Sequence, residues 1–106
     1  MIGRGPIDPV KVALIRGQLR SAFSLHCIAD LYNPDHSSQC YLLDRDDSVE
    51  HRLYVSKEFL DDHTAEEIQD LLRDWHAMDA IRAAGPQIVT ITNEGVRVEP
   101  ACRNWP

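Results

Sequence analysis

The chain has 106 residues, the size of one domain with one core, and 43% of them are hydrophobic. The sequence holds no apolar run of the roughly 20 residues that span a bilayer, and its start has no apolar segment typical of a secretory signal. The three cysteines, Cys27, Cys40 and Cys102, do not indicate a disulfide framework, so we expect free thiols in a reducing cytoplasm.

The charge is distributed unevenly along the chain. The total is −6, with +3 on residues 1–29, −10 on residues 30–81 and +1 on residues 82–106. A negative field repels nucleic acid and attracts basic protein surfaces. The charge therefore disfavours direct nucleic-acid binding and favours a basic partner.

After an arm at residues 1–7, Asp8 and Pro9 predict the start of a helix over residues 9–22. An aspartate accepts hydrogen bonds from free amides at a helix start, and proline suits the first helical position. Alternating apolar residues predict a strand within 25–32, although this segment also fits a continued helix. Residues 39–44 and 49–55 surround a polar turn and predict a β-hairpin.

A second helix is predicted over residues 65–83. Thr64 and Glu67 have the spacing of a capping box, and Gly85-Pro86 ends the helix. A β-branched run at 87–92, a turn and residues 96–98 predict a second hairpin, followed by a tail over 99–106. The expected fold is one α+β domain over residues 1–106, with an antiparallel sheet of about five strands, order α-β-β-β-α-β-β, packed against two helices.

The histidines and cysteines show no spacing typical of a metal site. The potential ligands are His26, Cys27, His36, Cys40, His51, His63, His76 and Cys102. His36 and Cys40 lie four residues apart, but no Cys-x-x-Cys pair is present to hold two ligands locally. We therefore expect no metal and no cofactor.

The sequence also disfavours an enzyme. Ser37, Ser38 or a cysteine could pair with a histidine, but no nucleophile elbow or glycine-rich turn presents such a pair. No phosphate-binding glycine motif is present either. The expected function is therefore non-catalytic.

Residues 24–32 have some features of the first helix of a helix-turn-helix motif. The likeness covers only this segment, and the turn and basic recognition helix that should follow are missing. DNA binding also loses its main electrostatic contribution in a chain with a net charge of −6.

Acidic residues gather in two segments that we predict to bind a partner. Glu66, Asp70 and Asp74 recur every four residues along the second predicted helix, and the complete candidate set is Asp62, Glu66, Glu67, Asp70, Asp74, Asp44, Asp46 and Asp47. The plainer interpretation is a solvated face that aids solubility. The more specific interpretation is that these residues bind a groove rich in lysine or arginine on a partner.

We therefore expect an inhibitor or regulator, monomeric or homodimeric, that occupies a basic, nucleic-acid-binding surface of a protein partner. Carboxylates can replace phosphates because they offer arginine a similar charge and acceptor geometry. Small acidic inhibitors encoded by phages and mobile elements, including many anti-CRISPR proteins, share this size and charge, although no motif supports the analogy. The alternatives are a dimeric DNA-binding regulator that uses the basic N-terminal helix, and an accessory subunit that docks through Trp75 or Trp105.

Overall fold

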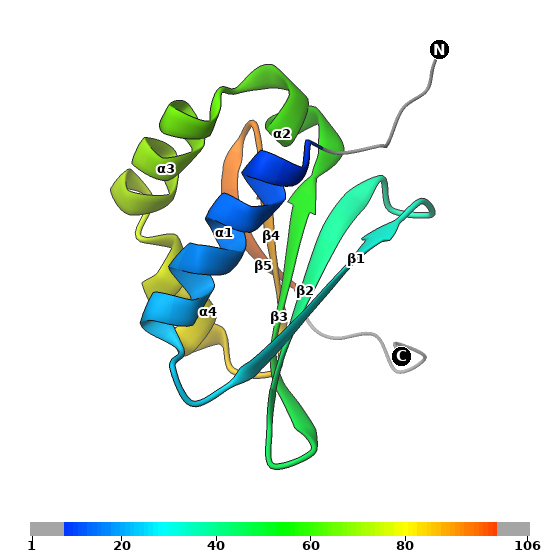
Figure 1. The fold of residues 1–106 in the computed structure, drawn as a ribbon, viewed down its shortest axis with the longest axis vertical. Helices are drawn as coiled ribbons and strands as arrows, with labels where there is room; N and C mark the ends of the chain where they lie inside the picture. Colours follow the sequence, from blue (N-terminus) through cyan, green and yellow to red (C-terminus); the bar gives the residue numbers. More distant parts are fainter. Residues whose placement is uncertain (1–7, 100–106) are drawn as a thin grey trace.

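A computed structural model describes residues 8–99, which form a five-stranded sheet with helices packed on one face (Figure 1). The strands lie side by side in chain order, β1 (Cys27–Asn33), β2 (Ser38–Arg45), β3 (Ser48–Ser56), β4 (Ile88–Thr92) and β5 (Gly95–Glu99). The helices are α1 (Pro9–Ala22), α2 (Lys57–Asp62), α3 (Ala65–Asp74) and α4 (Ala77–Ala84). This confirms the predicted α+β fold and the number of strands. The predicted N-terminal arm and most of the predicted tail lie outside the described residues.

Helix α1 begins as the sequence predicts. The Asp8 carboxylate accepts a hydrogen bond from the backbone amide of Val10 at 2.8 Å, and Pro9 occupies the first turn. Ile15 and Leu19 are buried against the sheet and the other helices. The Tyr41 hydroxyl of β2 donates to the Val12 carbonyl at 3.1 Å and so joins the sheet to the helix.

The segment that resembled part of a helix-turn-helix is a strand. Strand β1 pairs antiparallel with β2 from Cys27 to Asn33, so the helical alternative for residues 24–32 is wrong. Strands β2 and β3 form the predicted hairpin. Its register shifts once: Leu43 pairs with His51 and Asp44 with Val49, which leaves Glu50 as an extra residue in β3.

The second predicted helix is broken in two. His76 lies between α3 and α4 with φ 53° and ψ 44°, a left-handed conformation that ends a helix. The cause is a shift in the buried stripe: Ile68 and Leu72 are four residues apart, but Ala77 follows Leu72 after five. A turn at His76 allows both short helices to bury their apolar sides.

The sheet differs from the prediction at one pair of strands. Strand β4 pairs parallel with β3, whereas the other three neighbouring pairs are antiparallel. Three helices connect β3 to β4 and return the chain to the end of the sheet where β3 began (Figure 1). A parallel pair needs a crossover of this length, whereas a hairpin would have given an antiparallel one.

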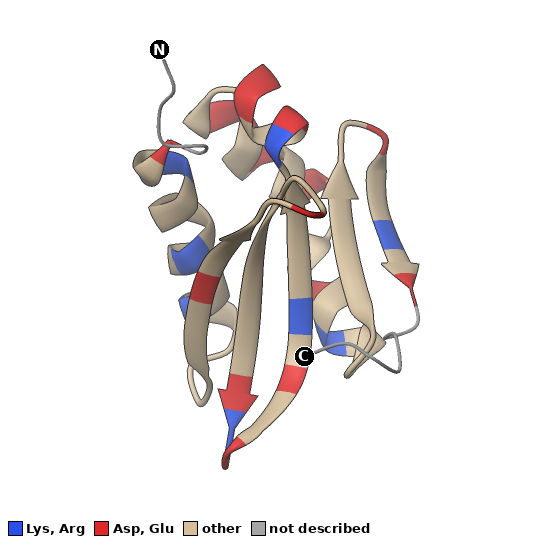
Figure 2. Ribbon diagram, turned by 90° about the vertical axis from the view of Figure 1, so that its right-hand side faces the viewer, with Lys and Arg blue, Asp and Glu red and all other residues tan. Residues whose placement is uncertain are grey.

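The main core lies between the sheet and the helices. It includes Tyr41, Leu53, Phe59 and Ile81, all fully buried. Figure 2 views the sheet from its other face, which no helix of residues 8–99 covers. None of the described helices is long and apolar enough to cross a membrane.

Candidate functional site

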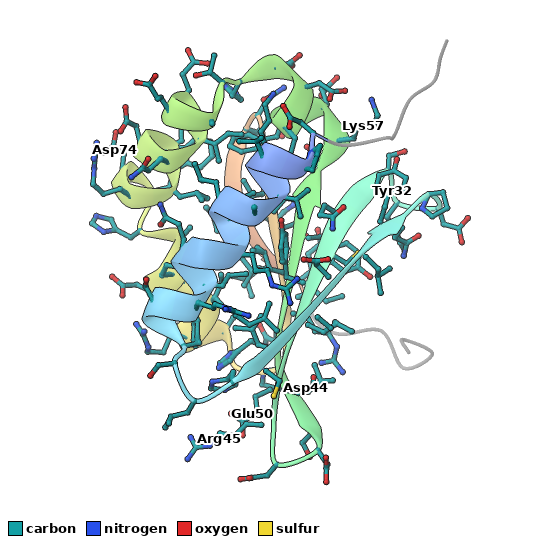
Figure 3. The ribbon with its side chains drawn as sticks, viewed as in Figure 1. Tyr32, Asp44, Arg45, Glu50, Lys57 and Asp74 are labelled. Carbon is teal, nitrogen blue, oxygen red and sulfur yellow. The ribbon has the colours of Figure 1, made fainter. Side chains whose placement is uncertain are left out.

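The largest group of predicted partner-binding residues lies on α2 and α3. We call Asp62, Glu66, Glu67, Asp70 and Asp74 the acidic helical surface. Figure 2 shows acidic residues on the helices at the upper end of the molecule, and Figure 3 labels Asp74 beside α3. The inward side of α3 carries the buried Ile68 and Leu72, so the acids stay at the solvent side. The side chains of Glu67, Asp70 and Asp74 are 59%, 61% and 62% exposed.

Part of this charge is paired within the chain. Arg73 lies 3.3 Å from Asp70 and 3.4 Å from Asp74, and its own side chain is 68% exposed. Ion pairs this exposed contribute about 0–1 kcal/mol and are readily exchanged for another partner. Glu66 makes no side-chain ion pair among residues 8–99, which leaves its carboxylate free on this surface.

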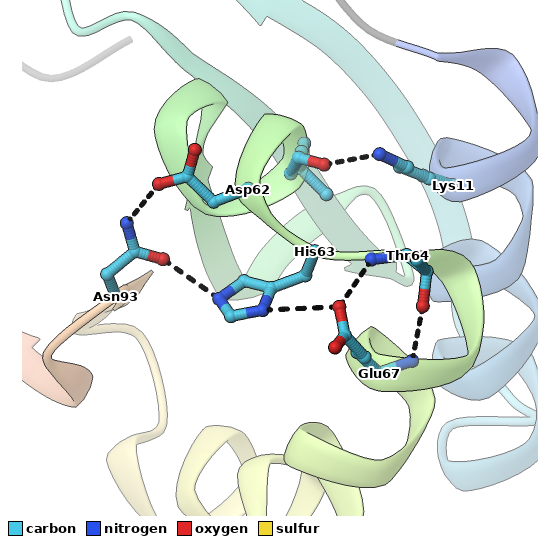
Figure 4. A network of polar contacts seen from close by, with 7 residues as sticks. Lys11, Asp62, His63, Thr64, Glu67 and Asn93 are labelled. Atoms are coloured by element: carbon cyan, nitrogen blue, oxygen red, sulfur yellow. Dashed lines mark hydrogen bonds and ion pairs between the residues drawn. The ribbon is translucent and has the colours of Figure 1, made fainter.

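A polar network holds the acidic helical surface in position (Figure 4). Thr64 accepts from the Glu67 amide at 3.1 Å, and Glu67 accepts from the Thr64 amide at 2.8 Å, which confirms the predicted capping box. Asn93, in the turn between β4 and β5, donates to Asp62 at 2.8 Å and contacts His63 at 3.0 Å. The network fixes α2 and the start of α3 to the sheet.

The second group of predicted residues lies at the opposite end of the molecule. Asp44 is the last residue but one of β2, and Asp46 and Asp47 form the turn to β3. Figure 3 shows Asp44 far from Asp74. Asp46 and Asp47 both have positive φ, 54° and 66°, a conformation that aspartate tolerates. One carboxylate oxygen of Asp44 is buried without a hydrogen-bond partner. The eight predicted residues therefore form two separate surfaces.

The basic side chains of α1 are largely used inside the fold. Arg16 pairs with Asp30 at 2.7 Å and donates to the Ile28 carbonyl at 2.8 Å. Lys11 donates to the Leu60 carbonyl at 2.6 Å (Figure 4). Of the three basic residues in this helix, only Arg20 is left fully to solvent.

The structure also brings together three metal-ligating side chains that the sequence did not group. One nitrogen each of His26 and His51 and one oxygen of Glu50 lie within 4.8 Å of one another. His26 Nε2 lies 2.9 Å from Glu50 Oε1, and the two imidazole rings are 5.3 Å apart. Burial, as the largest cause, lowers the pKa of His51 and favours its neutral form.

The sequence contained part of the signal for this group. His51 stands in the apolar alternation Val49, His51, Leu53, Val55, and a histidine in a buried stripe needs a polar partner. Strand alternation, however, would place Glu50 on the opposite face. Only the bulge puts it beside His51, and no residue pattern marks that bulge.

The other potential ligands and nucleophiles are dispersed. Cys40 is buried and contacts the Ser38 carbonyl at 3.9 Å, and burial raises the pKa of its thiol. The Ser38 hydroxyl donates to the backbone carbonyl of His36 at 2.9 Å, so this contact does not join the hydroxyl to the imidazole ring. The remaining described histidines, His63 and His76, lie on the α2–α4 side of the fold, and Cys102 lies outside the described residues. His26, Glu50 and His51 are the only group of three such ligands among residues 8–99.

Comparisons with protein-family models, curated proteins and solved structures found no match to this chain.

Proposed function

We propose that this protein is a non-catalytic inhibitor or regulator whose acidic helical surface binds a basic surface of a protein partner. The observation that carries the proposal is an array of exposed carboxylates on a helix that is capped and fixed to the sheet. Residues 57–74 hold seven acids against Lys57 and Arg73, a net charge of −5. A preorganised array loses little conformational freedom on binding, which favours affinity.

The chemistry of the array suits a partner that otherwise binds nucleic acid. Asp74 already accepts a hydrogen bond from the Arg73 guanidinium, and Asp70 forms an ion pair with it. An arginine of the partner would make the same interaction, as it would with phosphate. Complementary charge would also speed association, in a manner that salt weakens. An anti-defence protein of the anti-CRISPR type is one example of such a regulator.

The alternative of a DNA-binding regulator has less support. Lys11 and Arg16 make internal interactions, so contacting phosphate would require breaking them. The segment suggested as a helix-turn-helix forms β1. For an accessory subunit, Trp75 packs partly buried against the core, with its ring 5.8 Å from Phe59, and Trp105 lies outside the described residues.

Two matched double variants test which acidic surface binds. Glu66→Gln with Asp70→Asn removes two charges from the acidic helical surface without touching the capping box. Asp46→Asn with Asp47→Asn removes two charges at the opposite end, and asparagine tolerates the positive φ of both positions. Each tagged variant is used to capture partners from a lysate of the source cells, and the captured proteins are compared with those of wild type.

The proposal predicts a basic partner that wild type and the turn variant retain and the helix variant loses. Both variants should unfold within about 1 kcal/mol of wild type, since exposed charges contribute little to stability. Equal retention of the partner by all three proteins would contradict the proposal and assign the helix charge to solubility. Loss in the turn variant alone would move the interface to the Asp44–Asp47 end.

A further inference from the structure

The group formed by His26, Glu50 and His51 lies at the end of the sheet opposite the acidic helical surface. His26 precedes β1, and Glu50 and His51 lie in β3, where the chain comes close to the end of α4. The three side chains line a surface hollow of about 370 Å³ together with Phe23, Arg45 and Arg82, among others. Glu50 and Arg45 are seen at this lower end of the molecule in Figure 3.

His26 has an incomplete set of partners. Its side chain is 9% exposed; its Nε2 contacts Glu50, but its Nδ1 is buried without a hydrogen-bond partner. A buried polar atom in this state costs about 1–3 kcal/mol and needs an explanation. Because Nδ1 has no partner, the ring can carry its proton there and leave the lone pair of Nε2, which faces Glu50, for an ion.

His51 is held in the form that binds metals. Its Nδ1 lies 3.2 Å from the Gly85 carbonyl, which can only accept a hydrogen bond, so Nδ1 carries the proton. The lone pair of the neutral ring is then on Nε2. Metal-binding histidines commonly have this arrangement, in which the second nitrogen donates to a carbonyl or carboxylate.

The bulge in β3 completes the group. Because Glu50 is an extra residue between Val49 and His51, its carboxylate reaches the same side of the sheet as the His51 ring. Bulges that redirect a side chain are common next to functional sites. A regular strand would have pointed Glu50 to the opposite face.

The distances suit a small ion after modest side-chain rotation. With zinc bonds of about 2.0–2.1 Å, ligand atoms of a tetrahedral site are about 3.3 Å apart. His26 and Glu50 are already closer than this, at 2.9 Å, and the largest separation in the group is within 4.8 Å. Two imidazoles and one carboxylate prefer zinc and similar transition metals over magnesium or calcium.

From these observations we infer that His26, Glu50 and His51 bind one divalent transition metal ion of the zinc class. Three protein ligands leave a fourth position open, and that position faces the hollow. Arg45 and Arg82 also line the hollow, and their charges favour an anion as the fourth ligand. Arg82 is itself held by Asp79 and by the Ala22 carbonyl.

A zinc titration followed by calorimetry, with cobalt absorption to report the coordination, tests the site in the full chain under reducing conditions. Glu50→Gln removes the charged ligand, while its amide oxygen can still accept from His26. The Glu50 side chain is half-exposed, so we expect the variant to fold as the wild type does. His51→Gln removes a second ligand. His76→Asn is the matched control, because it removes an exposed imidazole far from the group and asparagine suits the left-handed backbone there.

The inference predicts one zinc ion per wild-type chain. Zinc affinity should fall at least about tenfold in Glu50→Gln and in His51→Gln, because loss of a residue that only hydrogen-bonds to a metal ligand already lowers metal affinity by this factor. His76→Asn should bind as wild type does. Substoichiometric zinc in the wild type, which the sequence pattern predicted, would overturn the inference. Equal affinity of the wild type and the two ligand variants would overturn it as well, since the zinc would then lie elsewhere, for example on a thiol.

Discussion

Trp75 ends α3 and packs against the main core while keeping part of its side chain exposed. Its ring lies 5.8 Å from that of Phe59, a fully buried residue of α2. Trp75→Ala should lower the free energy of unfolding by about 2–3 kcal/mol, less than the 3–5 kcal/mol of a fully buried aromatic residue. Urea denaturation measures this loss.

The same variant separates two roles of this side chain. A variant that keeps its stability and loses partner capture would contradict a core role for Trp75. It would instead make this residue an interface anchor, as in the accessory-subunit alternative.

At the scale of residues, the spacing of the acidic residues predicted their exposure to solvent better than it predicted their ion-pair partners. The four-residue recurrence of Glu66, Asp70 and Asp74 placed all three correctly on the solvent side of a helix. It did not show that Arg73 would pair with both aspartates, because a side chain's rotamer decides which neighbour it reaches. It also did not show that Glu66 would be left without an ion pair among residues 8–99.

At the scale of elements, caps were predictable and the helix break was not. Asp8 and Thr64 cap the helices that follow them, since their side chains accept from free amides nearby. Ser56 caps α2 in the same way. The sequence around the helix break at His76 contains no glycine or proline that would have predicted it. The break follows from the need of α3 and α4 to bury separate stripes, which is a tertiary requirement.

The left-handed conformation of His76 gives a stability prediction for the α3–α4 connection. His76→Val should lower the free energy of unfolding by about 1–2 kcal/mol, because a β-branched residue is strained at positive φ. His76→Gly relieves the backbone strain in the folded state. Glycine also gives the unfolded chain more conformational freedom, which offsets part of this gain, so we expect a stability close to that of the wild type. Thermal unfolding of both variants checks the order, and a more stable valine variant would show that α3 and α4 can form one continuous helix.

At the scale of the whole molecule, the α+β class and the number of strands followed from the order of the predicted elements. The parallel pairing of β3 with β4 did not, because it depends on where the intervening helices return the chain. The sequence likewise identified the acidic residues but treated them as one set. The fold separates the Asp44–Asp47 turn from the acidic helical surface and brings His26, which precedes β1, to Glu50 and His51 of β3.

The acidic helical surface lies at one end, whereas the hollow lined by Arg45 and Arg82 lies near the other. The two surfaces have no residue in common. Variants at one end should therefore leave binding at the other unchanged.

We propose that the acidic helical surface occupies a basic surface of the partner that otherwise binds nucleic acid. The most direct measurement is displacement of labelled duplex DNA from the captured partner by increasing amounts of this protein, with mobility shift of the DNA by this protein alone as a control. We expect no shift by the protein alone at physiological salt, displacement by wild type and by Asp46→Asn with Asp47→Asn, and markedly weaker displacement by Glu66→Gln with Asp70→Asn. Direct salt-sensitive binding of DNA by this protein, or equal displacement by both double variants, would contradict the account.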